Sequence, residues 1–157
     1  MKYSTLSPAG RVLKMVWRRS EKTFGYLMTD NLAKYGFSDA AWELAKAEGK
    51  AVLAECARDK KMISYTDFMH QIRSISFETP HDSRLPQFLA EISTEEVEAG
   101  RGMMTALIVR KTGDQRPGAG FFQLAKRLGY EVSDPEKFWL EEVNKVFASW
   151  QNEASRS

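Results

Sequence analysis

The chain has 157 residues, 43% of them hydrophobic and 28% charged, and its formal net charge at pH 7 is +2. These values favour one globular domain with a substantial core. No run of about 18 apolar residues is present, which excludes a transmembrane helix, and the first residues lack the apolar stretch of a secretion signal. Cys56 is the single cysteine, so no internal disulfide can form and we expect a cytoplasmic location.

The charges are unevenly distributed along the chain. Residues 1–37 contain seven Lys and Arg against two Asp and Glu, a local charge of +5. Residues 78–98 contain one basic residue and six acidic ones, a local charge of −5. Residues 99–130 contain six basic residues and one acidic one, a local charge of +5. Two interpretations are open: the blocks form a basic face that binds a polyanion, or they neutralise each other in the fold.

The expected organisation is a basic N-terminal arm or extension at residues 1–37, a single compact domain at 38–151 and a frayed tail at 152–157. In the arm, residues 7–19 are predicted to form a basic helix. Apolar periodicity then predicts five helices, over residues 38–59, 66–75, 85–99, 120–128 and 133–150.

Capping residues support several of these helices. Ser38 is placed to cap the first helix, and either Ser64 or Thr66 to cap the second. The motif "SDPE" at residues 133–136 is a capping box with an early proline. Within residues 38–151, strand propensity is found in "MISY" at residues 62–65 and in the apolar run within 104–110. The fold class is therefore α+β and mostly helical.

A glycine-rich basic loop follows the second strand, in "LIVRKTGDQRPGAGFF". A P-loop needs Lys after its last glycine, but residue 119 is Ala. A dinucleotide-binding motif needs a third glycine where the chain has Gln123. Nucleotide binding is therefore excluded. Two interpretations remain: an anion or nucleic-acid backbone binds at the start of the following helix, or the loop only turns the chain.

No catalytic residue, metal or cofactor is predicted. His70 and His81 lack the spacing of a zinc site, and Cys56 lies on the apolar face of a helix. A metal-dependent nuclease would need clustered carboxylates, and only Asp67, Glu78 and Asp82, close to His81, approach that pattern. Whether Asp67, Glu78 and His81 have a catalytic role is left open.

Two segments carry a resemblance to known domains. "ISYTDFMHQI" resembles the opening of small winged-helix-like domains, in which a short strand leads directly into a helix. "GRGMMTALIVRKTGDQRPGAGFFQLAKRLG" is similar to a segment of uncharacterised bacterial proteins with a P-G-x-G-F-F pattern, which occur alone or beside nuclease-type domains. The layout of residues 40–150 resembles the DNA-binding part of alkyltransferase-like proteins.

The resemblance implies a winged-helix-like core of about four to five helices with a small two- or three-stranded sheet, and it implies no catalytic residue. The chain departs from an ordinary winged helix, because residues 120–128 are helical where a wing strand would return.

The leading hypothesis is a small non-catalytic nucleic-acid-binding module, binding DNA rather than RNA, as an accessory subunit of a bacterial regulatory or phage-defence system. The helix-turn-helix-like pair at 66–75 and 85–99 favours it, although Glu91, Glu95, Glu96 and Glu98 make the second helix acidic. The predicted contacts are Arg11, Lys14, Arg18, Arg19, Arg110, Lys111, Arg116, Gly118 and Gly120.

The alternative is a protein-protein interaction module, an antitoxin- or immunity-like partner, in which the four Trp anchor an interface. A small metal-dependent nuclease is the third hypothesis. Neither the oligomeric state nor the cognate partner follows from the sequence.

Overall fold

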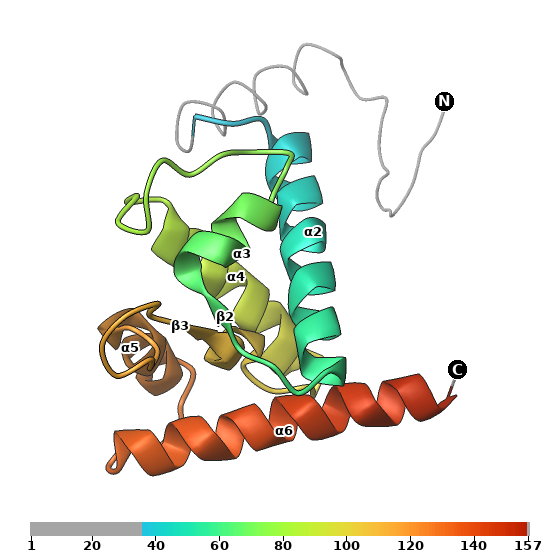
Figure 1. Cartoon of the computed structure of the whole chain (residues 1–157), viewed down its shortest axis with the longest axis vertical. Coiled ribbons are helices and arrows are strands. Elements are labelled where there is room, and N and C mark those ends of the chain that lie inside the picture. Colours follow the sequence, from blue (N-terminus) through green and yellow to red (C-terminus); the bar gives the residue numbers. More distant parts are fainter. Residues whose placement is uncertain (1–35, 157) are drawn as a thin grey trace. The chain divides into compact units, whose positions relative to one another are not determined.

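The computed structural model describes residues 36–156, and the chain divides into two compact units at residues 1–43 and 44–157. The described elements are the helices α2 (Asp39–Arg58), α3 (Tyr65–Gln71), α4 (Leu85–Glu98), α5 (Ala119–Arg127) and α6 (Pro135–Arg156), the 3-10 helix η2 (Met104–Leu107), and the strands β2 (Ile63–Ser64) and β3 (Ile108–Val109) (Figure 1). The predicted α+β, mostly helical fold class is confirmed. No helix within residues 36–156 is long and apolar enough to cross a bilayer. The predicted helix at 7–19 lies outside the described residues, and the domain boundary at residue 38 stays a prediction.

In the first unit, α2 begins as the sequence predicts. The backbone N–H of Ala41 donates to Ser38 Oγ at 3.1 Å, so Ser38 caps the helix. The Phe37 ring stacks on Trp42 with a centroid separation of 6.4 Å, which adds an apolar contact across the same first turn. The expected cap at Ser38 is confirmed.

The C-terminal end of α2 is closed by a left-handed residue. Lys60 has a φ of 55°, its N–H donates to Ala57 O, and the N–H of Lys61 donates to Cys56 O at 2.8 Å. This is the position at which glycine is preferred, because a side chain with a Cβ is strained there. The helix ends at Arg58, close to the predicted end.

Lys60→Gly is therefore expected to raise the free energy of unfolding by about 0.5 kcal/mol, the relief of strain less the entropy that glycine adds to the unfolded chain. Urea unfolding followed by circular dichroism measures this change. Lys61→Gly is the matched control, because Lys61 is not among the described residues with positive φ. Equal changes in the two variants would contradict the strain argument.

α3 is shorter than predicted. Ser64 caps it, accepting the N–H of Asp67 at 3.0 Å, and β2 leads directly into it as expected. The expected extension to residue 75 is wrong, because the Glu48 carboxylate of α2 binds the next segment. It accepts the N–H groups of Arg73 and Ser74 and the Ser74 hydroxyl, at 2.7–3.0 Å. These hydrogen bonds to a distant residue replace those that would continue the helix.

The predicted strand within 104–110 is mostly a 3-10 helix. Only Ile108 and Val109 pair with β2, in a parallel register of Ile63 with Ile108 and Ser64 with Val109. The segment before them is fully buried, and apolar periodicity does not distinguish a buried strand from a buried helix. The chain then continues through a loop into α5, so β3 is not followed by a wing strand in the described part.

Distant polar groups hold η2 in place between α4 and α6. The hydroxyls of Ser93 and Thr105 share a hydrogen bond, and Trp139 Nε1 donates to Ala106 O at 2.9 Å. The buried carboxylate of Glu142 accepts the N–H of Met103 at 3.0 Å. Met103, Met104, Leu107 and Ile108 have no exposed surface and form the centre of the core.

In the second unit, residues 44–157, α6 runs along the base, beneath α5 and the two strands (Figure 1). Asp134 Oδ1 accepts the N–H of Lys137 at 3.2 Å, so Asp134 caps α6 rather than Ser133, the first residue of the predicted box. At its other end, Gln151 Nε2 donates to the carbonyls of Ala57 and Arg58. This side chain caps the last carbonyls of α2 and joins the two helices.

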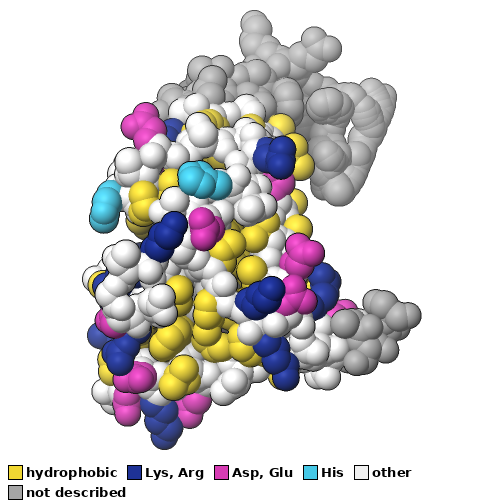
Figure 2. Space-filling view, viewed as in Figure 1, with side chains coloured by type: hydrophobic (Ala, Val, Ile, Leu, Met, Phe, Trp, Pro, Cys, Tyr) yellow, Lys and Arg dark blue, Asp and Glu magenta, His cyan; other side chains and the backbone are white. Residues whose placement is uncertain are grey.

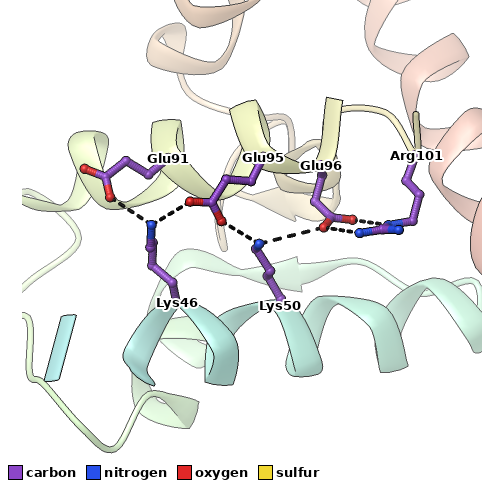
Figure 3. A network of polar contacts seen from close by, with 6 residues as sticks. All are labelled: Lys46, Lys50, Glu91, Glu95, Glu96 and Arg101. Carbon is purple, nitrogen blue, oxygen red and sulfur yellow. Dashed lines mark hydrogen bonds and ion pairs between the residues drawn. The ribbon is translucent and has the colours of Figure 1, made fainter. Parts of the chain in front are cut away.

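The acidic face of α4 is neutralised inside the fold. Three cations and three carboxylates form a chain of ion pairs between α2, α4 and the residues after α4: Lys46, Lys50, Arg101, Glu91, Glu95 and Glu96 (Figure 3).

Glu95 lies at the centre of this network. Burial raises its pKa, but hydrogen bonds from Lys46 at 2.7 Å and Lys50 at 2.6 Å outweigh that effect, so the net pKa lies below the usual range. Glu96 is 2% exposed and accepts two hydrogen bonds from Arg101, at 2.7 and 2.8 Å. Only the pair between Arg101 and Glu96 joins two of the charge blocks, and Lys46 and Lys50 come from outside them, so the choice between the two interpretations of the blocks stays open.

Candidate nucleic-acid interface

The loop between β3 and α5 is closed by its own backbone. The N–H of Arg110 donates to Arg116 O at 2.9 Å, so the two ends of the loop meet. Gly113 and Gln115 adopt positive φ values of 80° and 52° to make the turn. The closure brings Arg110, Lys111 and Arg116, three of the predicted contact residues, together at one end of the loop.

Two of these cations already have carboxylate partners. Arg110 binds both Asp114 oxygens at 2.9 and 3.0 Å, and Arg116 binds Glu136 at 2.6 Å. All four side chains are about half exposed, and such exposed pairs contribute little to stability. Neither pair is buried, and Lys111 is exposed beside them.

α5 begins immediately after the loop with no side chain capping it. Gly118 is the N-cap residue, and its own N–H donates to the Tyr65 hydroxyl at 2.9 Å. A Cβ on Gly120 would meet nothing within 4 Å, so the backbone here is open to approach. Exposed N–H groups at a helix start favour an anion. Gly118, whose N–H is already bound to Tyr65, and Gly120 both lie at this helix start.

A groove of 510 Å³ lies beside this helix start. Its apolar walls come from α4 through Leu85 and Leu89 and from α5 through Phe121 and Leu124. Three basic residues also line the groove: His81, Arg110 and Arg127.

None of the residues that line the groove is Asp or Glu. Charges of both signs are mixed over the face seen in Figure 2, whereas no carboxylate lines the groove.

Tyr65 and Arg127 line the groove but are not among the predicted site residues. Arg127 could have been found from helical spacing, because Gly120, Leu124 and Arg127 are separated by four and three residues and share one face of α5. Tyr65 comes from a distant element, and no local pattern links it to Gly118.

The four predicted contacts in the N-terminal block lie outside the described residues: Arg11, Lys14, Arg18 and Arg19. Their role stays a prediction.

The candidate catalytic residues lie in α3 and in the turn that precedes α4. Asp82 accepts hydrogen bonds from Arg84 and from the N–H of Glu78, which holds the turn around Pro80. Asp67 lies in the first turn of α3. Burial raises the pKa of the Cys56 thiol, which lowers the fraction of reactive thiolate. Among the described residues, no group of three or more His, Cys, Asp or Glu could hold a metal ion.

Three of the four Trp can be assessed as interface anchors. Trp42 and Trp139 are buried. Trp150 is half-buried, with the guanidinium groups of Arg58 and Arg101 over its ring at 5.2 and 5.3 Å. Burial therefore accounts for Trp42 and Trp139 but not for Trp150, whose buried Nε1 has no hydrogen-bond partner, and Trp17 lies outside the described part.

No protein-family model matches the chain, and no curated protein and no solved structure is significantly similar to it. The resemblance to winged-helix-like and alkyltransferase-like domains therefore stays a prediction.

Proposed function

We propose that the chain is a small non-catalytic module that binds nucleic acid, DNA in preference to RNA, through phosphate contacts at residues 110–120. The observation that carries the proposal is the hydrogen bond from Arg110 N to Arg116 O, which gathers three cations beside the uncapped start of α5. Lys and Arg side chains and helix N-termini are the groups that hold phosphates in such complexes.

The ion pairs of α4 remove the main objection to this function. Free carboxylates on α4 would repel a phosphate backbone, but Glu91, Glu95 and Glu96 pair with Lys and Arg of the same fold. Glu98 is exposed, and Glu95 keeps a side chain that is 42% exposed although it is paired. The repulsion expected from the sequence is therefore much reduced.

The double change Lys111→Ala and Arg116→Ala is expected to weaken DNA binding about ten-fold and to lower the salt dependence by about two phosphate contacts. Fluorescence anisotropy of labelled duplex DNA, single-stranded DNA and RNA at several salt concentrations measures both quantities.

The matched control is Lys60→Gln with Arg73→Gln, which removes two exposed charges outside the loop. If the control variant weakens DNA binding as much as the loop variant does, the loss of affinity comes from the change in net charge and not from the loop. Absence of binding at low salt would refute the proposal.

A further inference from the structure

The groove between α4 and α5 has the dimensions of a small-molecule site. Its volume of 510 Å³ lies within the range of about 300–1,000 Å³ that is usual for ligand pockets. Leu85, Phe121 and Leu124 are less than 10% exposed, so packing against the core fixes these walls before any ligand arrives. A preformed apolar wall favours a ligand with an apolar body.

The charge of the groove indicates the sign of the ligand. Arg110, Arg127 and His81 line it, and no carboxylate does, although Arg110 also binds Asp114 beside the groove. Arg127 is exposed at the rim. A cationic ligand would be repelled, and an anionic one would gain charge-assisted hydrogen bonds.

Tyr65 adds a neutral donor to the same groove. Its hydroxyl accepts the N–H of Gly118, which leaves the phenolic proton to be donated. Burial raises the pKa of Tyr65, so the hydroxyl stays protonated at neutral pH.

We propose that this groove binds a small amphiphilic anion, whose apolar chain or ring lies against Leu85, Leu89, Phe121 and Leu124 and whose carboxylate or phosphate lies among Arg110, Arg127 and Tyr65. The site differs from the proposed phosphate-contact loop, because it is enclosed by apolar walls and includes Arg127, which the loop does not. It shares Arg110, Gly118 and Gly120 with that loop, and its apolar walls and Arg127 distinguish it.

Two fluorescent probes of similar shape test the proposal on the full chain: anilinonaphthalene sulfonate, which is anionic, and phenylnaphthylamine, which is neutral. The anionic probe is expected to bind saturably and more tightly than the neutral one. Arg127→Gln is expected to weaken the anionic probe about five-fold or more and to leave the neutral probe unchanged. Lys126→Gln is the matched control, since it removes the same charge from the neighbouring α5 residue, which does not line the groove.

Competition with three ligands of one chain length identifies the head group. Octanoate or octyl phosphate is expected to displace the anionic probe at concentrations at which octanol does not. The anion that displaces the probe at the lower concentration identifies the preferred head group as carboxylate or phosphate. Leu89→Glu, which places a carboxylate in the groove, is expected to abolish probe binding, with near-ultraviolet circular dichroism confirming a native fold.

Equal affinity for the two probes, or an unchanged affinity in Arg127→Gln, would overturn the proposal. Displacement of the probe by DNA but by neither octyl anion would also overturn it, and would assign the groove to the nucleic-acid surface. The two proposals can fail separately, because Lys111→Ala with Arg116→Ala is expected to retain the probe and Arg127→Gln to retain DNA binding.

Discussion

Replacing Arg101 with Met is expected to lower the free energy of unfolding by about 3 kcal/mol, because it leaves the buried Glu96 carboxylate without its main partner. The Glu96 side chain is 2% exposed, and both of its close hydrogen bonds come from Arg101. The remaining cation, Lys50, lies 3.9 Å away and is already bound to Glu95. Urea unfolding followed by circular dichroism measures the loss.

The double change Arg101→Met and Glu96→Leu separates charge from packing. Because an apolar pair avoids the desolvation of Glu96, the double variant is expected to recover most of the stability that the single variant loses. If the loss came instead from the contact between Arg101 and Trp150, the double variant would remain as unstable as the single one. Arg110→Met is the control for an exposed pair and is expected to change stability much less.

Asp82→Asn is expected to lower the free energy of unfolding at pH 7 by about 2 kcal/mol, since the carboxylate holds the turn around Pro80 through hydrogen bonds to a charged group. Its side chain is 5% exposed, and it accepts hydrogen bonds from Arg84 Nε, Arg84 Nη2 and two backbone N–H groups. The Arg84 guanidinium holds the pKa of Asp82 well below its usual range.

The same pKa sets the pH dependence. A carboxyl with a lowered pKa in the fold contributes stability above its unfolded pKa of about 3.9, and this contribution is lost as pH falls toward the folded value. The difference between wild type and Asp82→Asn should thus be constant above about pH 5 and narrow in more acidic solution. A difference that does not depend on pH would contradict this assignment. Asp67→Asn, a change at an exposed carboxylate, is the control.

The turn that Asp82 holds borders the groove through Pro80 and His81. Asp82 and Glu48 together hold the segment between α3 and α4, which has no regular secondary structure of its own. Loss of either carboxylate is therefore expected to disturb the wall of the groove before it disturbs the core. In Asp82→Asn at pH 7, a weaker affinity for the anionic probe would report this disturbance.

Local features of the sequence predicted the elements that local hydrogen bonds determine. α4 was expected at residues 85–99 and spans Leu85–Glu98, and α5 was expected at 120–128 and spans Ala119–Arg127. The step from β2 into α3 and the cap at Ser38 are confirmed. Each of these depends on residues within about four positions of one another, which periodicity and capping rules describe.

The errors lie where distant side chains replace local hydrogen bonds. The end of α3 depends on Glu48, about 25 residues away, and the conformation of η2 depends on Trp139 and Glu142, more than 30 residues away. No pattern within one segment contains this information.

The sequence by itself determined the mostly helical class, the positions of the helices and the basic glycine loop with its candidate anion contacts. Only the tertiary structure decided that the carboxylates of α4 are paired and that Arg110 and Arg116 meet. It also decided that α4 and α5 enclose a groove without carboxylates. The physical reason is that charge pairing and cavity shape depend on which segments pack together, whereas helix formation and capping depend on neighbours along the chain.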